Sequence, residues 1–310
     1  MRAQPVVVGV DGSPESLRAA VIGSRIARTS SSECILVYAV PVLWTPDGVT
    51  DVSISSAIID RLKGPVCKAL AQAAVDDEVI ARAGKPGVVL NRVARERGAG
   101  LIVVGERHHG ALSRGLGGST AHHLVRTADV PVLVVEPRTE PINRVLAAVD
   151  LSHAGGQTLR AAASHAALLG ARLRAVHVVE PAKFPVVVGL SLDPAEYERR
   201  CRDEFHRLIE TELPDLPPDD RVVRTGIPDE EIAEEAAAWR ADLVVIGSHG
   251  KARIDRLLIG STTERLLNRQ SASLLVVPIR RPASKRRIVR RRGRARGGRQ
   301  TVGIKQPGRW

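Results

Sequence analysis

The sequence predicts an α/β protein made of two tandem copies of one domain, each a parallel, doubly wound sheet flanked by helices. Aromatic residues are only 2% of the 310 residues, so the core must be built from Val, Leu, Ile and Ala, as in a parallel sheet covered by Ala-rich helices. Short apolar runs alternate with helical patterns along the chain, and three segments recur in the same order.

The three repeated segments define the two copies. The pairs are "PVVVGVDGSPESLRAA" at 5–20 with "VLAAVDLSHAGGQTLRAA" at 145–162, "LIVVGERHHGALSRGLGGST" at 101–120 with "LVVIGSHGKARIDRLLIGST" at 243–262, and "DVPVLVVEP" at 129–137 with "SASLLVVPI" at 271–279. The offset is 139 residues from Asp11 to Asp150 and 142 from Gly105 to Gly247, a period that indicates tandem domains rather than a solenoid. The expected divisions are a first domain over 1–140, a second over 141–282 and a tail over 283–310, with "EPRTEPINR" at 136–144 as a short linker.

In the second copy, strands and helices alternate from the beginning. The apolar run at 144–150 ends in Asp150, and the helical apolar face over 157–169 ends at Gly170, where a C-cap belongs. The elements expected next are a strand at 173–179, a helix marked by Tyr197, Cys201, Phe205 and Leu208, a strand at 221–225, a helix marked by Ile232, Ala236 and Trp239, a strand at 243–247, a helix at 261–270 and a strand at 273–279. This alternation implies parallel strands with right-handed crossovers. The first copy fits the same template except in the region 41–63, where "PVLWTPDGVTDVSISS" predicts a loop.

The net charge of +12 originates in the C-terminal tail. Residues 280–310 hold 13 of the 46 Lys and Arg and none of the 34 Asp and Glu, so residues 1–279 are close to neutral. The tail has no apolar periodicity, and we expect it to be disordered and to bind a polyanion such as RNA, DNA or an anionic membrane face. It has no interleaved aromatic residues for base stacking, and a solvated tail without a specific partner is the alternative.

Two features predict a cytoplasmic protein. The apolar run in "MRAQPVVVGVDG" is far too short for a signal peptide, and no stretch approaches the ~20 apolar residues that a membrane span needs. Cys34, Cys67 and Cys201 are far apart and form no CxxC pair, so we expect three reduced thiols.

Glycines and hydroxyl residues follow the strands of the second copy, at the sheet edge where open α/β folds bind their ligands. Asp150 ends the first strand, Gly247 ends the fourth, and Gly260, Ser261 and Thr262 begin the helix before the fifth. A helix N-terminus offers free N–H groups to a phosphate, glycine permits a close approach of the backbone, and Asp150 can accept from a ribose hydroxyl or a base amine. The pattern predicts a nucleotide site formed mostly by backbone. The alternative is that Ser261 only caps the helix and the glycines only turn the chain.

The stretch "GSHGKARIDRLLIGS" at 247–261 matches the G-2x-G-9x-G-(S/T) signature of universal stress proteins, a family that the chain resembles over both repeats. The segments "AVD", "HVV" and "LLVVP" also lie in the family's order. The resemblance implies two Rossmann-like, adenine nucleotide alpha hydrolase-like domains, each with a five-stranded parallel sheet, and ATP, with or without Mg, as the ligand of the nucleotide-binding branch. It also implies that the domains associate through their fifth strands, as an internal pseudo-dimer and in a homodimer.

The resemblance assigns nucleotide contacts to nine residues of the second copy. By this assignment Asp150 and Val178 contact adenine or ribose, and Ala148 and Ile246 line the pocket for base and sugar. The glycines and hydroxyl residues that remain follow the ribose and phosphates: Gly247, Gly250, Gly260, Ser261 and Thr262.

The first copy departs from this pattern. Its corresponding residues are Gly9, Asp11, Ala39, Val104, Gly105, Gly118, Ser119 and Thr120. His108 stands where the second glycine belongs, and its side chain could block the close approach, while Glu106 adds negative charge beside the phosphates. Arg107 or His108 could instead bind phosphate directly, so nucleotide binding by the first copy stays open and the second copy is the better predicted site.

No motif indicates a dedicated enzyme. The sequence has no GxSxG, HExxH or CxxC, and "GKPG" at 84–87 is no P-loop because Pro86 follows Lys85. The pairs His108-His109 and His122-His123 do not predict a metal site, and slow ATP hydrolysis is the most that Asp150 could support. We therefore predict an ATP-dependent sensor or regulator of the stress response. The alternative is a nucleotide-free interaction and assembly module that the basic tail recruits to nucleic acid.

Overall fold

The computed structural model describes residues 3–40, 56–105, 120–136, 141–152, 154–181, 193–249, 259–269 and 272–279. Residues 1–279 form one compact unit. The expected loop up to residue 55 and the expected disordered tail over 283–310 lie outside the described residues. Over the ranges above, no helix is long and apolar enough to cross a membrane.

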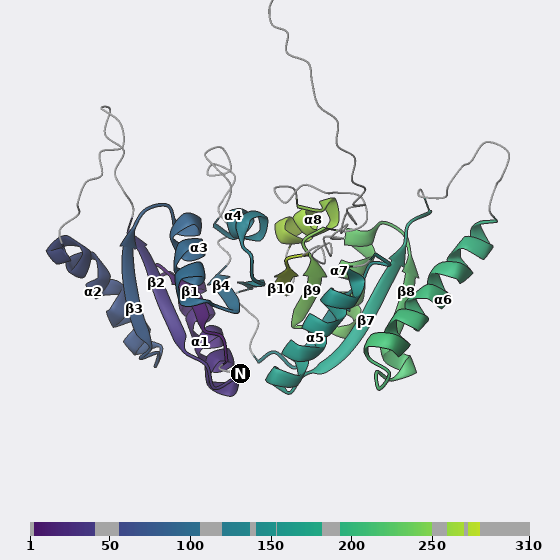
Figure 1. Cartoon of the computed structure of the whole chain (residues 1–310), viewed down its shortest axis with the longest axis horizontal. Helices are drawn as coiled ribbons and strands as arrows, with labels where there is room; N and C mark the ends of the chain where they lie inside the picture. The colour runs from purple at the N-terminus through teal and green to yellow at the C-terminus, as the bar shows by residue number, and fades with distance from the viewer. Residues whose placement is uncertain are drawn as a thin grey trace, which may run out of the picture. The chain divides into compact units, whose positions relative to one another are not determined.

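Each repeat folds into alternating strands and helices (Figure 1). The first half contains β1 (Val6–Val10), α1 (Pro14–Thr29), β2 (Cys34–Val40), α2 (Ser56–Gln72), β3 (Glu78–Ala83), α3 (Pro86–Arg97), β4 (Leu101–Gly105), α4 (Thr120–Thr127) and β5 (Val132–Val135). The second half contains β6 (Arg144–Ala148), α5 (Gly155–Leu169), β7 (Arg172–Val179), α6 (Pro194–Glu212), a short 3-10 helix (Pro218–Asp220), β8 (Arg221–Thr225), α7 (Pro228–Trp239), β9 (Leu243–Gly247), α8 (Ser261–Arg269) and β10 (Ser273–Val277).

Local sequence signals determine most helix ends. Ser13 precedes α1 and its hydroxyl accepts from the Ser16 amide, and Pro14 occupies the first turn, where its missing N–H costs nothing. Gly170 ends α5 in the left-handed conformation, with φ of 66°, which confirms the predicted cap. Helix α2 already begins at Ser56, the last residue of the predicted loop, and it continues through Pro65 because Val66 and Leu70 bury their side chains.

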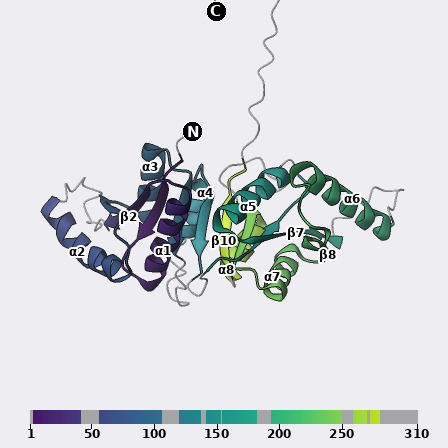
Figure 2. The same ribbon diagram turned by 90° about the horizontal axis from the view of Figure 1, so that it is seen from below.

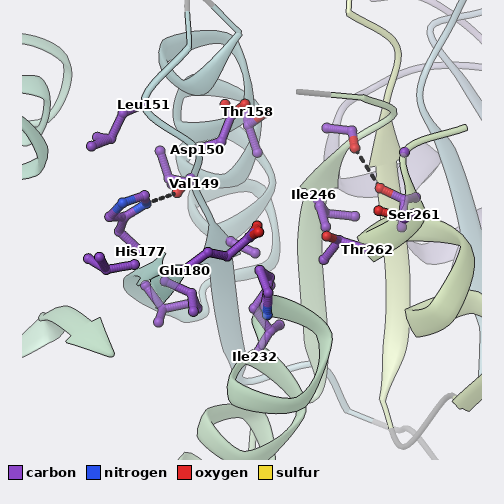
Figure 3. A pocket seen from close by; sticks show the side chains of 18 of the residues that line it. Val149, Asp150, Leu151, Thr158, His177, Glu180, Ile232, Ile246, Ser261 and Thr262 are labelled. Atoms are coloured by element: carbon purple, nitrogen blue, oxygen red, sulfur yellow. Dashed lines mark hydrogen bonds between the residues drawn. The ribbon is translucent and has the colours of Figure 1, made fainter. Parts of the chain in front are cut away.

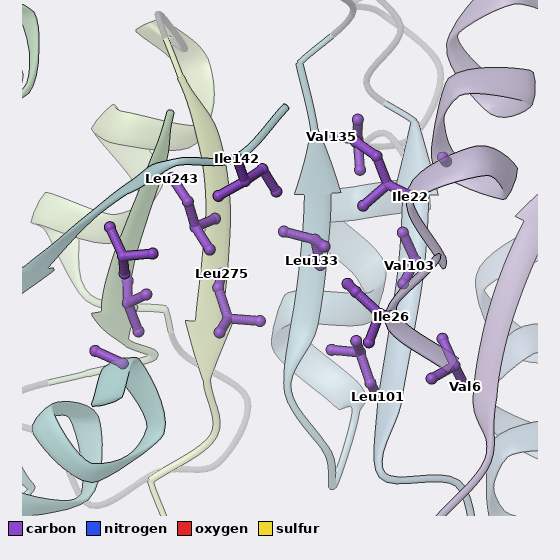
Figure 4. Packing of buried hydrophobic residues seen from close by; sticks show 14 of the residues in the cluster. Val6, Ile22, Ile26, Leu101, Val103, Leu133, Val135, Ile142, Leu243 and Leu275 are labelled. Atoms are coloured by element: carbon purple, nitrogen blue, oxygen red, sulfur yellow. The ribbon is translucent and has the colours of Figure 1, made fainter. Parts of the chain in front are cut away.

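The strands form one ten-stranded sheet in the order β3-β2-β1-β4-β5-β10-β9-β6-β7-β8. Within each half all five strands are parallel, which confirms the predicted fold class. The two fifth strands, β5 and β10, pair antiparallel, with Leu133 opposite Leu275. Both leucines are buried within one apolar cluster (Figure 4). This pairing agrees with the expected internal pseudo-dimer.

Helices cover both faces of the strands in each half. In the second half, α5 and α6 lie on one face, and α7 and α8 lie on the other (Figure 2). Along β1 the side chains alternate between two buried clusters, with Val6 and Val8 in one and Val7 in the other. This period of two is the pattern of a strand buried on both faces.

A cluster of buried charges joins β7 to the elements around β8. The guanidinium of Arg174 pairs with Asp220 at 3.1 Å and with Glu235 at 3.0 Å, and it lies 4.8 Å from the centre of the Trp239 ring. Only 8% of each carboxylate side chain is exposed, so each depends on its arginine partners, which also include Arg172 for Asp220 and Arg224 for Glu235. The cluster fixes the outer strands of the second half beside the cavity described next.

Candidate functional site

A cavity of about 290 Å³ opens at the carboxyl ends of β6, β7 and β9. Its walls come from the ends of these strands and from residues of α5, α6, α7 and α8 (Figure 3). The lining residues are Ala148–Leu151, Thr158, Val176–Glu180, Tyr197, Cys201, Pro228, Ile232, Ile246, Gly247, His249 and Gly260–Thr263. Parallel strands bring these distant segments together because all their carboxyl ends meet at one edge of the sheet.

Asp150 lines this cavity and has one buried, unpaired carboxylate oxygen. Its Oδ1 accepts from the Ser152 hydroxyl at 2.8 Å. Its Oδ2 is buried and, among the residues with described positions, finds no hydrogen-bond partner. Because buried polar atoms are nearly always paired, an orphaned acceptor on a residue that lines a cavity indicates a place for a donor from outside the chain. A sugar hydroxyl or a base amine has the required chemistry.

The first turn of α8 forms the opposite wall of the cavity. Figure 3 shows Ser261 and Thr262 across the cavity from Asp150 and His177. The amides of a helix's first turn have no partner within the helix, and the helix dipole adds partial positive charge there. The wall therefore suits a phosphate group.

Gly260 directly precedes α8, and the fold itself does not require a glycine there. A Cβ atom at Gly260 would lie 3.4 Å from His249 Cα and 3.5 Å from Ser248 O, which are ordinary contact distances. Its amide donates to Ser248 O at 2.8 Å, and its carbonyl accepts from the Glu264 amide at 2.9 Å. The absence of a side chain at Gly260 therefore keeps the cavity side open.

Side chains between the polar ends provide apolar surface and one phenol. Ile232 and Ile246 line one part of the cavity, and Tyr197 and Cys201 of α6 line another. Burial raises the pKa of Tyr197, and its hydrogen bond with Cys201 acts in the same direction. The phenol therefore stays protonated at neutral pH.

The structure brings eight of the nine site residues predicted in the second half to this cavity. They are Ala148, Asp150, Val178, Ile246, Gly247, Gly260, Ser261 and Thr262. Gly250 lies outside the described residues. The sequence analysis missed Thr158, His177 and Glu180. His177 and Glu180 are polar residues beside Val178 and Val179, at the carboxyl end of β7. Their place at this strand end is the signal that could have identified them.

The first half places its corresponding residues differently. Asp11 is exposed, and its Oδ1 accepts from the Ser13 amide at 3.0 Å, as part of the turn that begins α1. At Gly105 an added Cβ would lie 2.4 Å from the backbone of Glu15, so that glycine is required by packing against α1. At Gly9 an added Cβ would lie 2.9 Å from the Leu90 side chain. These glycines allow close packing inside the protein.

The other predicted residues of the first half have mixed positions. Ala39 is the last residue but one of β2, Val104 is buried in β4, and Thr120 begins α4. Gly118 and Ser119 lie outside the described residues, as do Glu106, Arg107 and His108, so the obstruction expected from His108 stays a prediction.

Within the ranges of the chain that the structure describes, no group of three or more His, Cys, Asp or Glu is placed to hold a metal ion. Cys34, Cys67 and Cys201 are free thiols, and burial raises the pKa of Cys34 to about 11. His122 of α4 has its pKa lowered, first by burial and then by Arg126.

Comparisons with known proteins agree with this architecture. The model of the universal stress protein family matches the chain twice, at residues 3–136 and 141–278. A universal stress protein of Mycobacterium tuberculosis is 28% identical over 296 residues, which cover 87% of this chain and 96% of that protein. A solved universal stress protein from Archaeoglobus fulgidus is 18% identical with a TM-score of 0.61, covering 90% of this chain and 99% of its own. A putative one from Pseudomonas aeruginosa is 20% identical with a TM-score of 0.62, covering 89% and 93%. These two structures share the fold.

Proposed function

Because the chain belongs to the universal stress protein family, with two tandem matches to it, we propose that it is an ATP-binding regulator whose nucleotide site lies in the second half. The observation that carries the proposal is the buried, unpaired Oδ2 of Asp150, a residue that lines a cavity closed on the other side by the start of α8. An acceptor at one end and free helix amides at the other match a ligand with hydroxyl or amine donors at one end and phosphates at the other. The regulator would occupy the cytoplasm, its domains spanning 1–140 and 141–282.

Each part of the cavity has a role in this proposal. Asp150 accepts from the ribose or the base, and Ile232 and Ile246 cover the faces of the ring. Gly260 leaves room for the phosphates, which the amides of the first turn of α8 and the hydroxyls of Ser261 and Thr262 bind. A Mg ion would arrive with the phosphates, because the described side chains offer no cluster of three metal ligands.

Regulation follows from the positions of these elements. The lining residues belong to seven separate elements of the second half, including α7 and α8, so a bound nucleotide would contact all of them at once. A ligand shifts the equilibrium between two conformations only to the extent that it binds one of them more tightly than the other. Partner proteins could then distinguish the loaded from the empty form.

Titration calorimetry of ATP into the full chain, after unfolding a sample to check for carried-over nucleotide, tests the proposal. We expect binding that is lost in Gly260→Glu, because the new carboxylate occupies the phosphate end of the cavity. The matched control is Gly118→Glu, at the corresponding position of the first half. If Gly118→Glu binds as much ATP as the wild type, the site is in the second half. If the wild type binds two equivalents of ATP and Gly118→Glu binds one, the first half also binds.

Absence of heat together with absence of co-purified nucleotide would contradict the proposal. The nucleotide-free interaction module would then be the better hypothesis, with the basic tail directing the protein to nucleic acid. Truncation before residue 283 would test that alternative through the loss of salt-dependent RNA binding.

A further inference from the structure

The pairing of β6 with β7 ends one residue earlier than the equivalent pairing in the first half. There the last pair of β1 and β2 is Val10 with Tyr38. The repeat offset of 139 residues makes Val149 and His177 the corresponding pair, yet the ladder of β6 and β7 stops just before it. At the carboxyl end of the ladder the two halves therefore differ by one pair, and that pair borders the cavity.

The register determines which backbone groups this difference leaves free. The Val149 amide donates to the Val176 carbonyl at 2.9 Å, so the polar groups of Val176 face β6. Because alternate residues of a strand face the same neighbour, the N–H and C=O of Val178 also point to that side. The next rung of the ladder would join the Val178 amide to the Val149 carbonyl.

The side chain of His177 binds that carbonyl instead. Its Nδ1 lies 2.8 Å from Val149 O, so this nitrogen carries the proton and donates (Figure 3). The ring is buried and stacks on Phe205, with 5.9 Å between centroids and 26° between planes. Tyr38, the counterpart in the first half, has no donor on the ring close to its backbone. A side chain therefore replaces the backbone rung only in the second half.

We propose that His177 is a positioning residue, which holds the Val149 carbonyl so that the Val178 amide and carbonyl face the base of the bound nucleotide and favour adenine over guanine. The inference rests on the proposed function and adds the residue that shapes its base-binding end. A neighbouring donor and acceptor complement the N1 acceptor and N6 amine of adenine. Guanine presents a donor at N1 and an acceptor at O6, so in the same position it would oppose like groups, and a site with unpaired polar groups rejects such a ligand.

The first experiment needs no nucleotide. Amide hydrogen exchange of the full chain should show rapid exchange at Val178 in the wild type. In His177→Leu we expect slower exchange, because the freed Val149 carbonyl can accept the Val178 amide and complete the ladder. His177→Asn should behave like the wild type, since its amide nitrogen takes the position of Nδ1. Tyr38→His is the matched control in the first half, where exchange at Ala39 should become faster.

The second experiment measures the affinities of the same variants for ATP and GTP. The wild type and His177→Asn should prefer ATP, and His177→Leu should lose about tenfold in ATP affinity with little change for GTP. His177→Gln, which places its amide one carbon further out, should resemble His177→Leu. A general destabilisation would weaken both nucleotides equally and would not be rescued by asparagine.

The outcomes separate this inference from the proposed function. Unchanged exchange at Val178 in His177→Leu, or an unchanged ratio of ATP to GTP affinity, overturns the role of His177 even if ATP binds. If the wild type binds neither nucleotide while the exchange pattern is as expected, the positioning effect stands and both the base preference and the nucleotide function are overturned.

Discussion

Replacing Asp150 by alanine should leave the empty protein about as stable as the wild type while removing its response to ATP. The unpaired Oδ2 costs about 1–3 kcal/mol, which the substitution recovers. The substitution also removes the 2.8 Å hydrogen bond from Ser152 to a charged acceptor, worth about 1.5–3 kcal/mol. These terms oppose each other, so we expect the free energy of unfolding to stay within about 1.5 kcal/mol of the wild type.

Urea unfolding with and without ATP measures both effects. At a hundredfold excess over Kd, ATP should stabilise the wild type by about 2.7 kcal/mol and Asp150→Ala not at all. The control is Asp220→Ala, which removes a buried carboxylate from its pair with Arg174 at 3.1 Å and should cost about 3–5 kcal/mol. A comparable loss in Asp150→Ala would refute the reasoning, because Asp150 would then stabilise the fold. A retained response to ATP would refute its role in binding.

Three further results are expected. Gly105→Ala should lower the free energy of unfolding by about 1–3 kcal/mol, because the new Cβ would lie 2.4 Å from backbone atoms of α1. Gly247→Ala should cost less, because its Cβ would meet only side chains, at 3.1 Å. Equal urea midpoints for the two variants would contradict this expectation. Burial lowers the pKa of His165 from 6.5 in the folded protein. As the pH falls, the unfolded chain therefore binds the proton before the folded protein does. The stability present above pH 6.5 should decline below that pH. That decline should be smaller in His165→Leu, and identical pH profiles would exclude His165 as its source. Iodoacetamide at neutral pH should modify Cys67 before Cys34, because burial raises the pKa of Cys34 to about 11. Equal rates of modification, measured by mass spectrometry, would be inconsistent with that burial.

The repeats and the apolar periodicity predicted the strands and the edge of the sheet where the cavity lies. These signals are local, since a strand buried on both faces must be apolar along its length, and Gly170 ends α5 for a local steric reason. The convergence of Asp150 and Gly260 could be predicted as well, because parallel strands share one carboxyl edge.

The difference between the two halves at the end of this strand pair could not be predicted in the same way. His177 and Tyr38 occupy equivalent positions in two similar strands, and their identities are visible in the sequence. That the His177 ring meets the Val149 carbonyl, whereas Tyr38 pairs with Val10 through the backbone, depends on the register between strands, which only the three-dimensional structure gives. Likewise, the need for glycine at Gly105 comes from the approach of α1, a contact between distant segments.

The antiparallel pairing of β5 with β10 places both halves of the sheet in one chain. In an assembly of identical subunits, one gene specifies both partners, so every substitution appears twice. Here each half has its own codons, and a change such as tyrosine for histidine at one strand end leaves the other half untouched. Two halves in one chain thus permit a division of roles: one half can keep a binding site while the other is free to diverge as its permanent structural partner.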